Sequence, residues 1–190
     1  MKKALILSTI VISLFSGCGG GGDRDTNLNN NSISGKSNDK NSYNLWNYFT
    51  PANSKTNNYR YYEGNKVSSY KSSYSVSETK VVEIDNYAPN EKTIYEKMPD
   101  YIKVSFEKNG KPNGLYKLKF YANIGDSVTV IESGCKLTKH YDNFSLKGEN
   151  FNDVIEIRCD DKPGYYQKNV GEIAQEIQNK NQKSIRVLAN

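Results

Sequence analysis

Alternation of apolar and polar residues is the feature that most limits what this chain can fold into. In three stretches the apolar residues stand at even-numbered positions: Tyr70, Tyr74, Val76, Val82 and Ile84 along 70–84, Ile102, Val104 and Phe106 along 101–106, and Tyr116, Leu118 and Phe120 along 116–121. Successive side chains of a strand point to opposite faces of a sheet, so a period of two predicts antiparallel strands with one packed face and one wet face. The expected fold class is all-β or mainly β, a single antiparallel sheet built as a meander or a curved half-barrel.

Turn residues separate the predicted strands. Two Asn-Gly pairs stand within 109–114, so 101–121 is predicted to be a hairpin with a moderately long loop. Further along, 128–131 predicts a short strand, and 138–150 reads as a polar excursion between two strands. The stretch 171–181 fits either a short helix or a hairpin. The hairpin is favoured because no capping box precedes the stretch and Gly171 opens it.

Two cysteines are placed to form a disulfide. Cys135 and Leu137 share one side of a predicted strand, and Ile155, Ile157 and Cys159 share one side of another. Both cysteines therefore fall on the apolar sides of their strands, as a buried cross-strand bridge requires. In an oxidising compartment such a pair is expected to be bonded.

The first 18 residues have the pattern of an export signal. Lys2 and Lys3 precede an apolar run over 4–15, which is too short to span a bilayer, and Ser16 and Gly17 lead into Cys18. This resembles the lipobox of bacterial lipoproteins, with Phe15 where that family more often has leucine. The resemblance implies that 1–17 is a signal peptide removed on export and that Cys18 carries acyl chains that hold the protein in a membrane.

The resemblance also implies a place in the cell envelope. Gly19 follows the cysteine, which by the enterobacterial sorting rule points to the outer membrane of a Gram-negative bacterium. The residues over 18–42 are mainly Gly, Asn, Ser and Asp, so this stretch is predicted to be a disordered, flexible tether. A β-domain is predicted over 43–190. Its stretches Asp153–Ile157, Tyr165–Tyr166 and Lys168–Ile173 are similar to the ends of uncharacterised antiparallel-β envelope lipoproteins.

No catalytic or metal-binding pattern stands out. The single histidine, His140, lies in the polar excursion and is interpreted as a solvated loop residue, and no nucleophile motif or zinc ligand set accompanies it. No cofactor is predicted. Without Lys2 and Lys3, the 26 basic residues of the chain fall to 24 against 21 acidic ones, a net charge of +3. No basic stripe suggests a nucleic-acid partner.

These features predict a non-enzymatic lipoprotein of the cell envelope that acts as a binding or structural module. Its partners are expected to be the membrane, through Cys18, and an envelope protein, glycan or lipid. The 15 tyrosines suit a sheet with half-buried positions, and a curved tyrosine-lined face would suit a glycan or a protein. The alternative is a carrier that holds a lipid or another hydrophobic ligand inside an open β half-barrel. A ligand-sized cavity would favour the carrier.

Overall fold

The computed structural model of the protein describes residues 42–130, 134–179 and 182–189. The predicted signal peptide, Cys18 and the tether up to residue 41 lie outside these ranges. The elements are, in chain order, β1 (Tyr43–Asn44), α1 (Leu45–Phe49), β2 (Lys55–Glu63), β3 (Lys66–Val76), β4 (Lys80–Asp85), β5 (Glu91–Lys97), β6 (Tyr101–Lys108), β7 (Lys111–Lys119), β8 (Tyr121–Ala122), β9 (Cys135–Leu146), β10 (Glu149–Cys159), β11 (Lys162–Gln167), β12 (Gly171–Asn179) and β13 (Gln182–Leu188).

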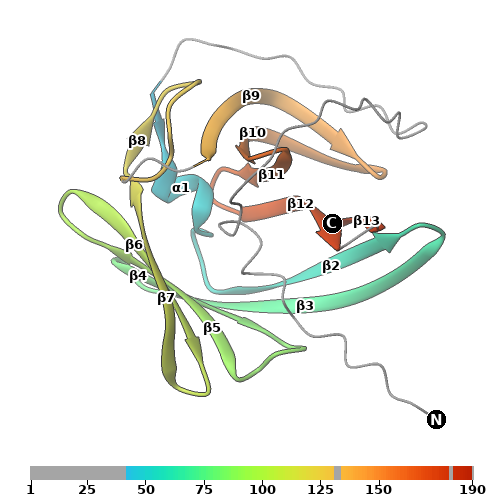
Figure 1. The fold of residues 1–190 in the computed structure, drawn as a ribbon, viewed down its shortest axis with the longest axis horizontal. Helices are drawn as coiled ribbons and strands as arrows, with labels where there is room; N and C mark the ends of the chain where they lie inside the picture. The colour runs from blue at the N-terminus through green and yellow to red at the C-terminus, as the bar shows by residue number, and fades with distance from the viewer. Residues whose placement is uncertain (1–41, 131–133, 180–181, 190) are drawn as a thin grey trace.

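Eleven of these strands form one antiparallel sheet, in the order β7-β6-β5-β4-β3-β2-β13-β12-β11-β10-β9. Two meanders, β2 to β7 and β9 to β13, are joined where β13 pairs with β2. The sheet curves around α1, with β9 and β10 on one side and β2 and β3 on the other (Figure 1). The prediction of an all-β, curved and unclosed antiparallel sheet is confirmed.

A short segment, 125–130, spans the space between the two edge strands of the sheet. On one side, Lys119 N donates to Val128 O at 2.9 Å, which ties the segment to β7. On the other side, Leu137 N donates to Asp126 O at 3.0 Å, which ties it to β9. The predicted strand over 128–131 is therefore wrong: Thr129 makes an isolated bridge to Leu118 of β7, Ser127 makes one to Lys136 of β9, and Ile131 lies outside the described residues. The backbone groups of both edges are satisfied here by one irregular segment.

Two predicted strand runs differ in detail from the structure. The run 70–84 is divided between β3 and β4 by a turn at 77–79, which shifts the alternation so that Val81, and not Val82, is fully buried. The hairpin over 101–121 is confirmed, but its loop is short. Asn109 and Gly110 alone form the turn, both with positive φ, and the strand β7 resumes at Lys111. Asn-Gly suits such a turn because both residues tolerate this backbone region.

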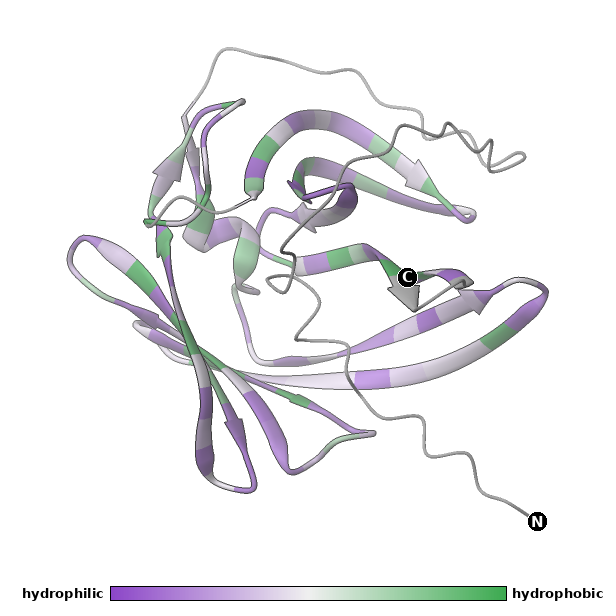
Figure 2. Cartoon of the chain, viewed as in Figure 1, coloured by the Kyte–Doolittle hydropathy of each residue, from purple (hydrophilic) through white to green (hydrophobic). Residues whose placement is uncertain are grey.

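The hairpin predicted for 171–181 is confirmed over the described residues: 171–179 forms β12, which pairs with β13, and 180–181 lie outside the described residues. The predicted polar excursion at 138–150 is wrong. β9 continues to Leu146, β10 begins at Glu149, and two residues with positive φ, Lys147 and Gly148, make the turn between them. Polar residues dominate this stretch because one face of the hairpin is wet, and the other carries buried aromatic rings. Polar and apolar residues follow one another along β9 in Figure 2.

The buried side chains form two clusters on opposite faces of the β9–β11 part of the sheet. Tyr165 and Tyr166 are neighbours in β11, and each belongs to a different cluster. The first cluster includes Leu45 and Tyr48 of α1 with residues of β6, β7, β9 and β10. The second is built largely from aromatic rings of β2, β3, β9, β10 and β11. Within the described residues, no helix is long and apolar enough to cross a membrane.

Candidate functional site: a polar groove around Asp153

A groove of about 900 Å³ opens beside the start of the domain. Its lining residues come from β1, α1, β9, β10 and the turn after β11: Ser42, Tyr43, Asn44, Asn47, Tyr48, His140, Asp142, Asn152, Asp153, Lys168 and Asn169. Binding sites for small ligands typically measure about 300–1,000 Å³. The groove is in this range, and its wall is mainly polar.

Asp153 lies at the centre of the groove and is held by three other residues. Tyr48 Oη donates to Asp153 Oδ1 at 2.5 Å, and His140 Nε2 lies 2.9 Å from the same oxygen. Lys168 Nζ lies 3.3 Å from Oδ2. Burial by itself would raise the pKa of Asp153, but the hydrogen bonds from Tyr48 and His140 and the charge of Lys168 outweigh it, and the pKa lies below its ordinary value. Asp153 is therefore a fixed carboxylate at neutral pH.

The backbone at Asp153 is left-handed, with φ of 49°, although the residue lies inside strand β10. The ladder between β9 and β10 pairs Asn152 with Asn143 and Val154 with Tyr141, and Asp153 between them is unpaired. Its carbonyl oxygen accepts instead from Lys168 N at 3.1 Å. Such a conformation costs free energy within a strand, and strained residues of this kind cluster at functional sites. Here it turns the carboxylate toward α1 and Lys168.

His140 is a buried strand residue, and its interpretation as a solvated loop histidine is wrong. It is 8% exposed, lies in β9 and packs against the ring of Tyr43 at 5.0 Å between centroids. A carboxylate can only accept, so Nε2 is assigned a proton and donates to Asp153. Nδ1 is buried, makes no hydrogen bond within the described part of the chain, and lies 3.8 Å from Asp142 Oδ1. Through Nε2, this histidine orients the Asp153 carboxylate.

Burial and the hydrogen bond to Asp153 raise the pKa of the Tyr48 hydroxyl well above its ordinary value. Tyr48 therefore remains a hydrogen-bond donor across the neutral range. It comes from α1, whose N-cap Asn44 accepts from Trp46 N at 3.1 Å. The helix is held against the turn after β11, because Asn169 N donates to Asn47 O at 2.6 Å. This contact brings the amides of Asn47 and Asn169 to one wall of the groove.

A second polar cluster lies inside the curve of the sheet, around a cavity of about 60 Å³. Glu83 on β4 accepts from Tyr74 Oη at 2.8 Å, and Tyr59 Oη donates to the carbonyl oxygen of Glu172 at 2.9 Å. Burial raises the pKa of the Glu83 carboxyl. The ion pairs found among the described residues do not include Glu83.

Arg186 on β13 supplies the positive charge of this interior cluster. Its guanidinium donates to the carboxylate of Glu172 and, at 3.2 Å, to Gln175 Oε1. It also lies over the rings of Tyr59 and Tyr70, at 5.4 and 5.7 Å from their centroids. The side chains of Arg186 and Glu172 are 11% and 15% exposed. The opposite wall of the cavity is apolar and includes the disulfide.

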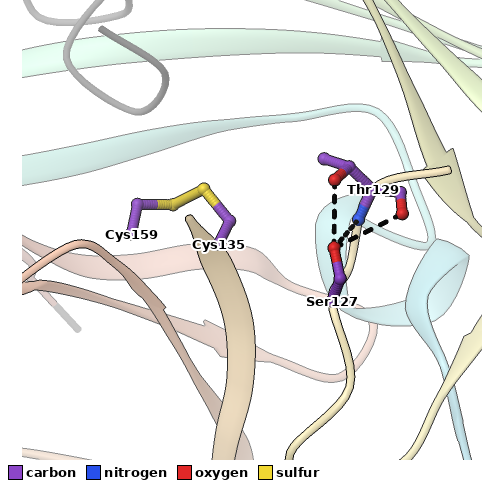
Figure 3. Close-up of a disulfide and its surroundings, with 4 residues drawn as sticks. All are labelled: Ser127, Thr129, Cys135 and Cys159. Carbon is purple, nitrogen blue, oxygen red and sulfur yellow. Dashed lines mark hydrogen bonds between the residues drawn. A yellow bond between two sulfur atoms is a disulfide. The ribbon is translucent and has the colours of Figure 1, made fainter. Parts of the chain in front are cut away.

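The predicted disulfide is present. Cys135 and Cys159 are paired residues of β9 and β10 and are bonded to each other. Figure 3 shows the bridge close to Ser127 and Thr129 of the segment that spans the sheet edges. Cys18, the predicted lipidation site, lies outside the described residues.

Apart from His140, whose environment was predicted wrongly, sequence reasoning did not identify the residues of the two polar clusters. Asp153 had no local signal, since it stands in an ordinary apolar strand pattern. Glu172 and Arg186 carried no motif either. Within the described part of the chain, no group of three or more His, Cys, Asp or Glu side chains could hold a metal ion. Comparisons of the chain with protein-family models, with curated proteins and with solved structures found no match.

Proposed function

We propose that the protein is a lipoprotein of the cell envelope, anchored through acyl chains on Cys18, that acts as a non-enzymatic binding module. The groove around Asp153 is the site of contact. One observation carries this assignment: a groove of about 900 Å³ contains a carboxylate that is fixed by Tyr48, His140 and Lys168 at the cost of a left-handed backbone inside a strand. Preorganised polar groups of this kind lower the cost of binding.

The alternative, a carrier of a lipid or another hydrophobic ligand, has less support. The cavity inside the sheet measures about 60 Å³, well under the few hundred Å³ that a ligand of that kind fills. Its wall also contains Glu83, Glu172 and Arg186, and desolvating these groups beside an acyl chain would be costly. In the proposed function the lipid anchor holds the protein in a membrane, and we expect this to be the outer membrane.

Replacing Cys18 by serine is expected to remove the anchor, because a hydroxyl cannot form the thioether to the lipid. The variant should lose its acyl mass and leave the membrane fraction. Intact-mass measurement and detergent phase partitioning check this. Cys159→Ser is the matched control and should keep both the acyl mass and the membrane association. A Cys18→Ser protein that still carries acyl chains and sediments with membranes would refute the lipobox interpretation.

A photoreactive residue in the groove tests the site. We expect benzoylphenylalanine at Asn152, an exposed residue of the groove, to form a light-dependent adduct in intact cells, because this ring inserts into a bound partner of any class. The same residue at Asn90, exposed in the turn between β4 and β5, is the matched control and should form no adduct. Equal labelling at both positions, or none at either, would argue against the groove as the contact site. Gel mobility and mass of the adduct give the readout.

A further inference from the structure

The two oxygens of the Asp153 carboxylate have different surroundings. Oδ1 is occupied by Tyr48 and His140, which are both largely buried. Oδ2 faces Lys168, whose side chain is 46% exposed, and the Asp153 side chain is itself 40% exposed. The part of the carboxylate that a ligand can reach is therefore beside Oδ2, where a fixed acceptor and a lysine donor lie side by side.

This pair selects against charged ligand groups. A ligand ammonium at Oδ2 would lie close to the Lys168 ammonium, and a ligand carboxylate or phosphate near Lys168 would meet Asp153 and Asp142. Like charges at such short range oppose binding. A hydroxyl meets neither obstacle, since it can donate to Asp153 and accept from Lys168 at the same time.

The neighbouring wall of the groove carries two side-chain amides that can also form hydrogen bonds with hydroxyl groups. The side chains of Asn47 and Asn169 line the groove and make no hydrogen bond to any residue that the structure describes. Each amide offers two donors and one acceptor, which matches a row of hydroxyls. The two residues are held together by the backbone bond from Asn169 N to Asn47 O.

We propose that the groove binds a neutral oligosaccharide, with one sugar hydroxyl held between Asp153 Oδ2 and Lys168 and its neighbours held by Asn47 and Asn169. This inference rests on the proposed function, because it names the class of ligand for the same groove. The aromatic rings of Tyr43 and Tyr48 are largely buried, so recognition uses hydrogen bonds and not an exposed stacking platform.

The test uses the full mature protein with its anchor, purified in micelles of a detergent without a sugar head group. The probes are three trimers: neutral N-acetylglucosamine, its deacetylated and cationic form, and anionic galacturonic acid. Binding is followed by calorimetry and by ligand-observed NMR. We expect the neutral trimer to bind, and both charged trimers to bind at least about tenfold more weakly, the loss expected when a buried or fixed charge meets a like charge.

Variants separate the groove from other surfaces. Asp153→Asn should weaken binding of the neutral trimer about tenfold or more, because it removes a hydrogen bond to a charged acceptor, and asparagine tolerates the left-handed backbone. Asn47→Ala should weaken binding with the fold unchanged, since the Asn47 side chain has no partner in the described protein. Lys168→Met should act like Asp153→Asn, and Lys92→Met, an exposed lysine on β5, should change nothing.

The outcomes separate this inference from the proposed function. Equal or tighter binding of a charged trimer, or neutral binding that survives Asp153→Asn and Asn47→Ala, overturns the inference. If no trimer binds up to about 10 mM, far weaker than useful affinities, and position 152 still forms an adduct in cells, the ligand is of another class and the groove remains the contact site. If neither binding nor an adduct is found, both proposals fail.

Discussion

Replacing Glu172 by glutamine is expected to lower the free energy of unfolding by about 3–5 kcal/mol at neutral pH, the usual loss when one partner of a buried ion pair is removed. Burial and the nearby Glu83 carboxyl raise the pKa of Glu172, but the direct contact with the Arg186 guanidinium favours its ionised form. The Arg186 guanidinium lies inside the sheet against Glu172, Gln175 and the rings of two tyrosines. Without the carboxylate it would be a buried cation with only an amide acceptor. Urea unfolding of the wild type and the variant, followed by circular dichroism, measures the difference.

Glu83→Gln is the matched control in the same cavity. The Glu83 carboxyl has no cationic partner among the described residues, and its amide replacement can still accept from Tyr74. This variant is expected to keep or raise the free energy of unfolding at neutral pH. If Glu83→Gln and Glu172→Gln destabilise the protein equally, the two carboxyls play the same part and the assignment of the ion pair to Glu172 is wrong.

The pH dependence of Glu83 follows from its raised pKa. The folded protein binds the proton of this carboxyl more tightly than the unfolded chain, whose pKa is about 4.5. The contribution of protonated Glu83 is therefore complete below the unfolded pKa and declines as pH rises toward the folded pKa. Stability of the wild type relative to Glu83→Gln should rise as the pH is lowered from 8 to about 5. A constant difference over this range would contradict the raised pKa.

Loss of the disulfide is the second large effect. Cys135 and Cys159 are 24 residues apart, and opening a loop of this size is expected to cost about 3 kcal/mol through the entropy of the unfolded chain. For a domain of about 150 residues, this lowers the melting temperature by roughly 6–12 °C. Calorimetry of the Cys135→Ala/Cys159→Ala variant checks the value.

Two further measurements support or reject the role of the bond. Reductant should lower the melting temperature of the wild type and leave the double variant unchanged. Because Val128 N donates to the carbonyl oxygen of Cys135, we also expect faster hydrogen exchange in the segment 125–130 when the bond is absent. Identical melting of the wild type with and without reductant would show that the bond contributes little.

The alternation of apolar and polar residues along the chain predicted much of the sheet. The alternation of Ile102 and Val104 with their polar neighbours predicted β6, and both residues are buried. The same reasoning placed Cys135 and Cys159 on packed faces, and they are bonded. It failed at 138–150, because polar residues on the wet face of a long hairpin resemble a loop when the buried rings between them are widely spaced.

The alternation also could not predict which face of the sheet each residue of strand β12 takes. Tyr165 pairs with Ala174 and Tyr166 with Glu172, so a bulge at Ile173 breaks the alternation and turns Glu172 to the cavity. A bulge inserts one residue and has no fixed sequence signature. Glu172 therefore could not be distinguished from a solvated glutamate by position alone.

The sequence by itself determined several of the strands, the disulfide partners and the expectation of an anchor at Cys18, because each follows from neighbours within one strand or one short motif. The tertiary structure alone decided which polar groups meet. Tyr48, His140, Asp153 and Lys168 come from four separate segments, and their contact depends on how far the sheet curves around α1 and on one left-handed residue. Alternation tells which face a side chain takes, but long-range pairing and curvature decide what lies opposite that face.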